Sequence, residues 1–395
     1  MKRIYMDNCK TSKPAPEAIE AMMIYLTEKY QYPGDFVSTK TEIADDIQKF
    51  KQTIAKSINA TPKEFNFTSG GTSANNLAIK GILEENSNKG KHIICSVVDY
   101  PDLLTNAAYL ESNGFSVTYL SVDWDGFIDL TELEEAIQPD TILFMTTMVN
   151  HTIGTIQPMQ KIKKILESAN HKIFYHIDSC QAYGRIPVDV KELGADTLSI
   201  SGHKIHGVQG VGGLFIKKGT KVGLIKHGIA RFNQFETGNI SVPGMAAFAK
   251  ATELAFTDFE KKTKYIRSLS DYLYQKIEKT IPNIMLNGPK GEMRSPHNMN
   301  ISFDYIEGEA IMMMLDMYGI EVDTGSACAS KGLKANYVLM GTGRNHVQSH
   351  SSMKFTFSRY NTKNEIDYLV EKLAEIVQEL RNRSPLYNKN SQTTK

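Results

Sequence analysis

The chain has 395 residues, and its 45 Lys and Arg side chains balance its 44 Asp and Glu side chains to a formal charge of +1. This balance argues against nucleic acid or an anionic membrane as the main partner, because proteins that bind either usually carry a basic excess. No apolar run approaches the roughly 18 residues of a membrane helix, and the start of the chain has charges where a signal peptide needs apolar residues. We therefore expect a cytoplasmic protein built from two or three domains, or from one large α/β domain and a smaller companion.

The first two thirds of the chain alternate short apolar runs with longer amphipathic runs. Strand-like segments lie at residues 64–68, 92–95, 116–120, 141–145, 173–177, 197–200 and 212–216. Helical patterns lie at residues 75–85, 103–113, 130–137 and 162–170. Apolar strands separated by helices of about ten residues indicate βαβ units and a mostly parallel sheet. The predicted fold class is therefore α/β.

After about residue 262 the pattern changes to that of a smaller α+β domain. Helices are expected at 266–281, 309–318 and 363–381, and strands at 298–303 and 353–357. The Met312–Met314 run reads as core packing. We predict a large domain over residues 16–262, a small domain from residues 1–15 and 263–382, and a polar tail at 383–395.

Three predicted strand ends carry unusual residues, and ligands of open parallel sheets bind beyond the carboxyl ends of the strands. Thr68–Ser73 follows one strand and opens a helix, and its glycines let backbone N–H groups approach a phosphate closely. A purely structural turn is an equally good reading of this segment alone. It lacks the Gly-Lys-Ser/Thr of a nucleotide P-loop, which argues against a nucleoside triphosphate.

The other two strand ends carry a carboxylate and an amine. Asp178 directly follows an apolar strand, where it is either a helix N-cap or the partner of a buried cation or hydrogen-bond donor. Lys204 stands 26 residues later among small polar residues and can form a Schiff base. His203 and His206 have no evident third ligand, so no metal site is expected.

Together, the three strand ends form a pattern that pyridoxal phosphate requires. The lysine holds the aldehyde, the aspartate keeps the pyridine nitrogen protonated so that the ring acts as an electron sink, and the glycine-rich segment anchors the phosphate. The sequence therefore predicts pyridoxal 5'-phosphate as the cofactor.

The four cysteines are too few and too scattered for a disulfide framework, and none forms a CxxC pair. Three of them, Cys9, Cys95 and Cys180, read most simply as small buried side chains. Cys328 differs because it lies in a loop of small residues, where a packing role is a poor explanation. We interpret Cys328 as an accessible, functional thiol.

With these motifs in hand, nearly the whole chain resembles the cysteine desulfurases of the IscS/NifS group, which are class V aminotransferases of fold type I. The strongest stretches are Phe67–Thr72, Asn75–Gly81, Ile153–Pro158, Ser201–Ile205, Glu307–Glu309 and Gly325–Cys328. The resemblance implies a large domain with a mostly parallel seven-stranded sheet and a homodimer. It also implies an activity that converts L-cysteine to L-alanine and passes sulfur to an acceptor protein.

The resemblance also implies a role for individual residues. Lys204 would carry the cofactor and shuttle protons, while Cys328 would become a persulfide. Asp178 would pair with the pyridine nitrogen and Gln181 with the ring oxygen. The phosphate would be held by Gly71, Thr72, Ser201 and His203, with Thr237 reaching in from a second subunit.

The chain departs from the family pattern mainly where the substrate would bind. Tyr100 replaces a histidine stacked over the cofactor ring, and it is a poorer acid–base group at neutral pH. His151 takes the place of an asparagine beside the cofactor. Lys354 replaces the arginine that binds the substrate carboxylate, which keeps the charge but loses the bidentate fork. Lys10 replaces a small residue and adds a cation to the pocket.

Cysteine desulfurase is therefore the leading prediction, with Cys328 as the sulfur carrier. Because the departures at Tyr100, His151 and Lys354 face the substrate, a pyridoxal-phosphate lyase or transferase acting on another amino acid, selenocysteine included, is the first alternative. The second is a catalytically weak paralogue that regulates a sulfur-transfer partner, although a scaffold would not need Lys204.

Overall fold

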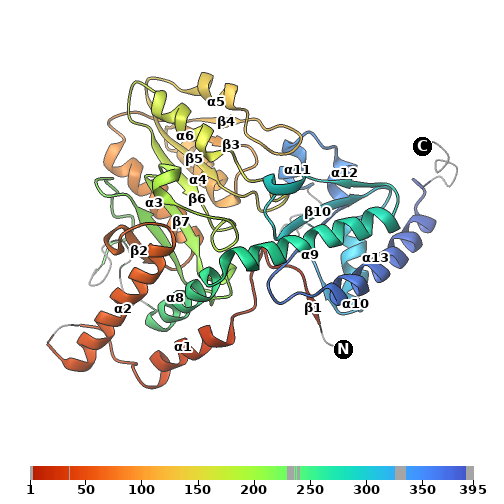
Figure 1. Cartoon of the computed structure of the whole chain (residues 1–395). Helices are drawn as coiled ribbons and strands as arrows, with labels where there is room; N and C mark the ends of the chain where they lie inside the picture. The colour runs from red at the N-terminus through yellow and green to blue at the C-terminus, as the bar shows by residue number, and fades with distance from the viewer. Residues whose placement is uncertain are drawn as a thin grey trace.

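The computed structural model describes residues 3–34, 36–228, 241–324 and 335–387, together with Phe235 and Thr237. A seven-stranded sheet occupies one part of the molecule (Figure 1). Its strands are β2 (Phe65–Thr68), β3 (His92–Ser96), β4 (Ser116–Leu120), β5 (Thr141–Thr147), β6 (Phe174–Asp178), β7 (Thr197–Ser201) and β8 (Gly212–Ile216). The strand order is β2-β8-β7-β6-β5-β3-β4; β7, β6, β5, β3 and β4 run parallel, while β8 is antiparallel to both neighbours. The predicted mostly parallel sheet is confirmed.

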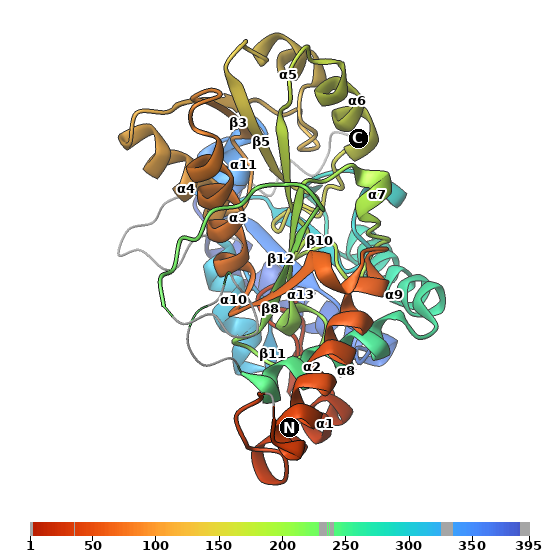
Figure 2. The ribbon, with the colours of Figure 1, turned by 90° about the vertical axis from the view of Figure 1, so that its left-hand side faces the viewer.

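Alternate residues along the strands point to opposite faces of this sheet, and helices cover both faces (Figure 2). Ile94 and Phe144 belong to the hydrophobic cluster on one face, whereas Ile93 and Leu143 belong to the cluster on the other. The connecting helices are α3 (Gly71–Asn86), α4 (Pro101–Ser112), α5 (Leu130–Ala136), α6 (Met159–Ser168) and α7 (Val190–Leu193). Because most of the sheet is buried from both sides, its inner strands are rich in apolar residues, while the edge strand β4 is partly exposed.

Three further helices, which the sequence patterns did not single out, pack beside this sheet. They are α1 (Pro16–Thr27), α2 (Ser38–Ser57) and α8 (Val242–Phe256). Both α1 and α2 pack on α8, which buries Ala246, Ala247, Ala249 and Ala251. Small side chains let the helix backbones approach closely, so composition rather than a strong apolar stripe determines this packing.

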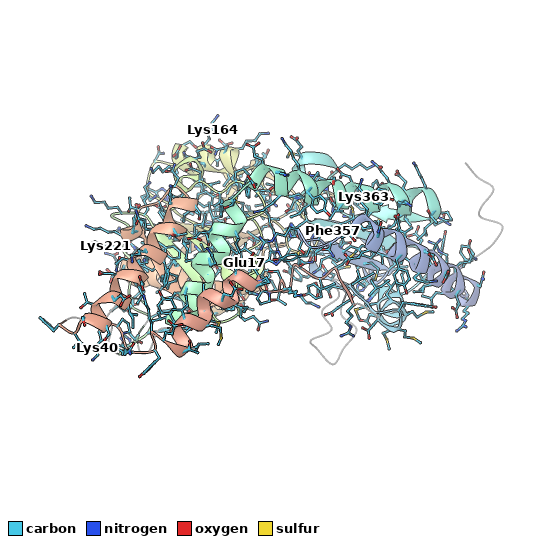
Figure 3. The ribbon with its side chains drawn as sticks, turned by 60° about the horizontal axis from the view of Figure 1, so that its bottom comes forward. Glu17, Lys40, Lys164, Lys221, Phe357 and Lys363 are labelled. Carbon is cyan, nitrogen blue, oxygen red and sulfur yellow. The ribbon has the colours of Figure 1, made fainter. Side chains whose placement is uncertain are left out.

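The second part of the molecule has its own hydrophobic cluster and smaller sheets. Its elements are β1 (Ile4–Tyr5), α9 (Phe259–Thr280), β9 (Ile284–Leu286), β10 (Asn298–Phe303), α10 (Gly308–Met317), β11 (Ile320–Glu321), α11 (Tyr337–Gly341), α12 (His346–His350), β12 (Ser352–Thr356) and α13 (Lys363–Arg383). Strands β9, β10 and β12 form an antiparallel sheet, and β1 pairs parallel with β11. In Figure 3, Lys40 lies at one end of the molecule, and Lys363 lies in the second part, toward the other side. The domain boundaries at residues 16, 262 and 382 stay a prediction.

The Met312–Met314 run was expected to be core, and for Met313 this is wrong. Met313 is 68% exposed, while Met312 and Met314 are half-buried against a cluster that contains Ile311 and Leu315. Consecutive residues of a helix are about 100° apart, so three in a row cannot all face one core. Among the helices of the described residues, none is long and apolar enough to span a membrane.

Candidate active site

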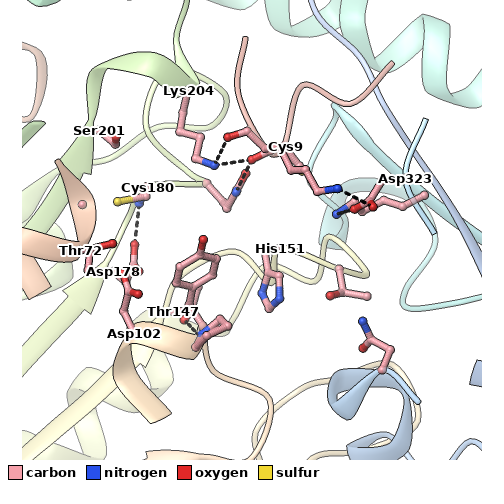
Figure 4. A pocket seen from close by; sticks show the side chains of 18 of the residues that line it. Cys9, Thr72, Asp102, Thr147, His151, Asp178, Cys180, Ser201, Lys204 and Asp323 are labelled. Atoms are coloured by element: carbon pink, nitrogen blue, oxygen red, sulfur yellow. Dashed lines mark hydrogen bonds and ion pairs between the residues drawn. The ribbon is translucent and has the colours of Figure 1, made fainter. Parts of the chain in front are cut away.

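The three unusual strand ends meet at one edge of the seven-stranded sheet. Thr68 of β2 pairs with Gly212 of β8, which in turn pairs with Ser201 of β7, and Asp178 of β6 pairs with Ser199. They open onto a cavity of about 590 Å³ (Figure 4). Ten predicted site residues line it, namely Gly71, Thr72, Tyr100, His151, Asp178, Gln181, Ser201, His203, Lys204 and Lys354.

Two predicted site residues are not placed in this cavity. Thr237 is half-buried and lies against Gly228, where a Cβ atom would come 3.1 Å from the Thr237 Cβ. It is not among the described residues that line the cavity. Cys328 lies outside the described residues.

The glycine-rich segment forms a cradle at the N-terminus of α3. Gly70 has a φ of 149°, a conformation that favours glycine, and a Cβ atom on Gly71 would come 2.6 Å from the Cys180 Sγ. A neighbouring hollow shares Gly71, Thr72, Ser201 and His203 with the cavity. The buried Ser201 Oγ has no hydrogen-bond partner in the described structure. A helix N-terminus with an unused hydroxyl fits a phosphate group and goes beyond what a structural turn needs.

Asp178 is fixed by hydrogen bonds within the protein. Its Oδ2 accepts from the Asn75 Nδ2 at 2.9 Å, and its Oδ1 accepts from the backbone N–H of Cys180 at 2.9 Å. Asn75 is held in turn by the His176 Nε2, 3.1 Å from its Oδ1. The next helix, α7, begins only at Val190, so the N-cap reading of Asp178 is wrong. The buried carboxylate can accept a further bond from a protonated ring nitrogen.

Lys204 ends a short 3₁₀ helix (Gly202–Lys204) and its side chain is buried. Its Nζ donates to the backbone oxygens of Cys9 and Lys10, at 2.5 and 2.7 Å. Burial is the main cause that lowers the pKa of Lys204 to about 8. Gln181 steadies the same segment, since its Nε2 donates to the Cys9 oxygen at 3.0 Å.

Two aromatic rings and a histidine form the opposite wall. The Tyr100 and His151 rings meet edge to face with centroids 5.0 Å apart, and the Tyr337 hydroxyl lies 3.4 Å from the His151 Nε2. The His151 Nδ1 is buried with no partner in the described structure. Burial, with Lys354 and Lys204 nearby, lowers the pKa of His151 to about 3. His151 is therefore neutral, with one nitrogen available to a ligand.

Four charged side chains form the far end of the site. Asp323 joins two lysines, because its Oδ2 lies 2.7 Å from the Lys354 Nζ and its Oδ1 lies 2.8 Å from the Lys10 Nζ. Asp7 is 3.6 Å from the Lys10 Nζ. Burial alone would raise the pKa of Asp323, but Lys354 and Lys10 outweigh it and hold that pKa at about 2. Burial and the Asp323 charge raise the pKa of Asp7 to about 6.

Sequence reasoning missed several residues that build this site, chiefly Cys9, Asn75, Asp323 and Tyr337. Asn75 lies inside a motif that the sequence did single out, so its position on the first turns of α3 could have suggested a partner at the strand ends. No local pattern signals Asp323, because its partners Lys10 and Lys354 are far away in the chain. Tyr337 likewise reaches the site only through the tertiary fold.

Comparison with known proteins places the chain in a family. Residues 4–369 match the model of the aminotransferase class-V family. A protein named cysteine desulfurase IscS from Dictyoglomus turgidum is 42% identical, over 98% of this chain and 97% of that protein. The IscS of Methanosarcina thermophila is 40% identical, over 99% of this chain and 96% of that protein.

A solved structure described as a NifS-like protein shares the fold with 29% sequence identity and a TM-score of 0.90, covering 96% of this chain and 100% of that one. This likeness and the family match extend over the seven-stranded sheet, the cavity and the second part of the molecule. The chain belongs to the aminotransferase class-V family.

Proposed function

We propose that this protein is a pyridoxal-phosphate-dependent cysteine desulfurase that converts L-cysteine to L-alanine and leaves the sulfur on Cys328. The observation that carries the proposal is the combination of three groups at one cavity with the full-length family match. The buried Lys204, Asp178 and the Gly71 cradle face one space in a chain that matches named cysteine desulfurases over almost its full length.

The described residues fit the cofactor at each of its functional parts. Gly71, Thr72, Ser201 and His203 would hold the phosphate, and Asp178 would hold the ring nitrogen. Lys226, whose Nζ lies 3.3 Å from the Ser73 Oγ, adds a cation beside the phosphate cradle. When bound, the cofactor supplies an electron sink for bonds to the substrate Cα.

Lys204 supplies the amine at the centre of the site. An ordinary lysine is almost fully charged near neutral pH, whereas a pKa of about 8 leaves an appreciable fraction of Lys204 as neutral amine. The Cys9 and Lys10 carbonyl oxygens aim this amine until it moves to the cofactor. Neutral His151 can offer one ring nitrogen to a ligand as a hydrogen-bond donor or acceptor without placing a second buried charge in the wall.

The sulfur step balances without any added oxidant. The Cys328 sulfur forms a new S–S bond with the substrate sulfur, the Cβ–S bond of L-cysteine breaks, and its electron pair takes a proton at Cβ. L-Cysteine and one thiol thus give L-alanine and one persulfide. We propose that the persulfide passes its sulfur to an acceptor protein in the cytoplasm.

A homodimer belongs to the same proposal, with Thr237 contributed to the phosphate site of the second subunit. One side of α1 and the segment after it expose large apolar side chains, which are typical of a protein–protein interface. They include Ile19, Met23, Leu26, Tyr30 and Phe36. Sedimentation velocity on the holoenzyme measures the oligomeric state directly.

The deciding test is incubation of the holoenzyme with L-cysteine and a reductant, with sulfide and alanine both quantified. Equal amounts of the two products are expected, and the Cys328→Ala variant should retain the cofactor spectrum and lose both products. Sulfide formation that survives in Cys328→Ala would move the sulfur carrier elsewhere.

One observation favours a second candidate, a lyase or transferase acting on another amino acid. Lys354, which the resemblance assigns to the substrate carboxylate, is already ion-paired with Asp323. A survey of amino-acid substrates with the same holoenzyme separates the two candidates, because a desulfurase should release sulfide only from cysteine.

A further inference from the structure

The two lysines of the charged cluster at the far end of the cavity differ strongly in burial. The Lys354 side chain is only 6% exposed, and the Asp323 carboxylate, equally buried, faces it at 2.7 Å. The Lys10 side chain is 64% exposed, although its Nζ also contacts Asp323, at 2.8 Å. Both lysines line the cavity, but only Lys10 has room to turn its ammonium group.

Moving Lys354 toward a ligand would cost a buried ion pair. Asp323 would then keep only the exposed Lys10, and removing one partner of a buried ion pair is strongly unfavourable. Lys10 carries no such cost, because its exposed ammonium keeps three N–H donors and exchanges them between Asp323 and solvent. The buried Lys354–Asp323 pair is therefore suited to hold the structure of the site, and the exposed Lys10 is suited to contact a ligand.

The backbone of Lys10 strengthens this difference. Its carbonyl oxygen accepts a hydrogen bond from the Lys204 Nζ, so the residue lies directly beside the reacting amine. The amino and carboxylate groups of an α-amino acid are separated by a single carbon. The Lys10 side chain starts beside the reacting amine and lines the same cavity, so its exposed ammonium group can turn toward a carboxylate held next to that amine.

We propose that Lys10, rather than Lys354, binds the α-carboxylate of the amino-acid substrate, and that Lys354 is a positioning residue that acts through Asp323. The inference rests on the proposed function, since it names a contact for the substrate of that reaction. It also explains how the site keeps its carboxylate specificity although the expected cation is engaged by Asp323.

The experiment compares ligands with and without a carboxylate on the holoenzyme. L-Alanine and ethylamine differ only in that group, and the absorption change of the bound cofactor gives a Kd for each. Lys10→Met should raise the Kd of L-alanine and the KM of L-cysteine about tenfold or more, as expected for a lost charged hydrogen bond. The Kd of ethylamine should change less than about twofold, and Lys10→Arg should restore alanine binding.

Matched variants make the result specific. Lys13→Met removes an exposed lysine three residues away and should leave all three constants unchanged. Lys354→Arg keeps a cation opposite Asp323, so alanine binding should still depend on Lys10 in that background, whereas a fall in the KM of L-cysteine would assign the carboxylate to Lys354. Lys354→Met should weaken L-alanine more than ethylamine, because Asp323, having lost its buried partner, would hold the Lys10 ammonium more firmly and away from the ligand.

The outcomes separate this inference from the proposed function. An unchanged alanine Kd in Lys10→Met, or an equal loss for alanine and ethylamine, overturns the role of Lys10 even if the wild type releases sulfide. If the wild type releases no sulfide but alanine binding still depends on Lys10, the carboxylate contact stands and the desulfurase proposal fails.

Discussion

The two ends of the cavity, which we call the cofactor end and the substrate end after the groups we propose bind there, are built by different means. The cofactor end consists of strand and helix termini of the seven-stranded sheet, where Gly71, Asp178 and Ser201 follow directly from the chain path. The substrate end consists of charged side chains brought together from the N-terminal segment, the residues after β11, and β12. The first depends on backbone geometry, and the second on a balance of charges.

This difference teaches which changes each end tolerates. In the cradle of the cofactor end, backbone amides serve any phosphate, so a substitution at Gly71 matters mainly through bulk. At the substrate end, each charge fixes its neighbours, so a single substitution changes the state of the others. The four charges of Asp7, Lys10, Asp323 and Lys354 sum to zero when both carboxylates are ionised.

The largest effect is expected for Lys204, the residue that connects the two ends. Lys204→Ala should abolish the visible absorption of the bound cofactor and lower turnover by at least about 1,000-fold, because the reacting amine is gone. Lys204→Arg keeps a charge and should behave like the alanine variant. An unchanged absorption band in Lys204→Ala would show that another amine holds the cofactor.

A smaller effect, on stability, separates the two lysines of the substrate end. Lys354→Met should lower the free energy of unfolding by about 3 kcal/mol, because the buried Asp323 loses its buried partner. Lys10→Met should cost less than about 1 kcal/mol, since its side chain is 64% exposed. Urea unfolding of both variants measures the difference, and the double variant Lys354→Met/Asp323→Leu should recover most of the loss. Equal losses of unfolding free energy in the two variants would contradict the structural role of Lys354.

The smallest predicted effect tests whether cofactor binding is sensitive to the size of the side chain at position 71. Gly71→Ala should weaken cofactor binding about tenfold, because the new Cβ would come 2.6 Å from the Cys180 Sγ. Cys180→Ala alone should bind the cofactor normally, and Gly71→Ala/Cys180→Ala should recover most of the affinity. Fluorescence titration with pyridoxal phosphate gives these values. A double variant as weak as Gly71→Ala would place the constraint in the backbone.

Much of the fold followed from local patterns in the sequence. Strands buried on both faces are rich in apolar residues, which made the inner strands stand out in the printed sequence, and the partly exposed edge strand β4 stood out by its alternating Val117, Tyr119 pattern. The α8 helix was missed because an alanine-rich helix packs by close approach of the backbones rather than by a strong apolar stripe. The α2 helix does carry such a stripe, at Ile43, Ile47 and Ile54, which the sequence could have revealed. The prediction that all three consecutive methionines lie in the core was wrong for Met313, because successive residues of a helix point in different directions.

The cofactor end of the site was determined by the sequence itself. Strand ends of a parallel sheet meet at one edge, so a glycine-rich turn, Asp178 and Lys204 at such ends were bound to face a common space. The substrate end was decided only by the tertiary structure. Lys10, Asp323 and Lys354 are distant in the chain, and Coulomb interactions depend on distance and burial rather than on sequence order. The resemblance assigned the substrate carboxylate to Lys354, and only the folded structure showed that Asp323 already holds this lysine.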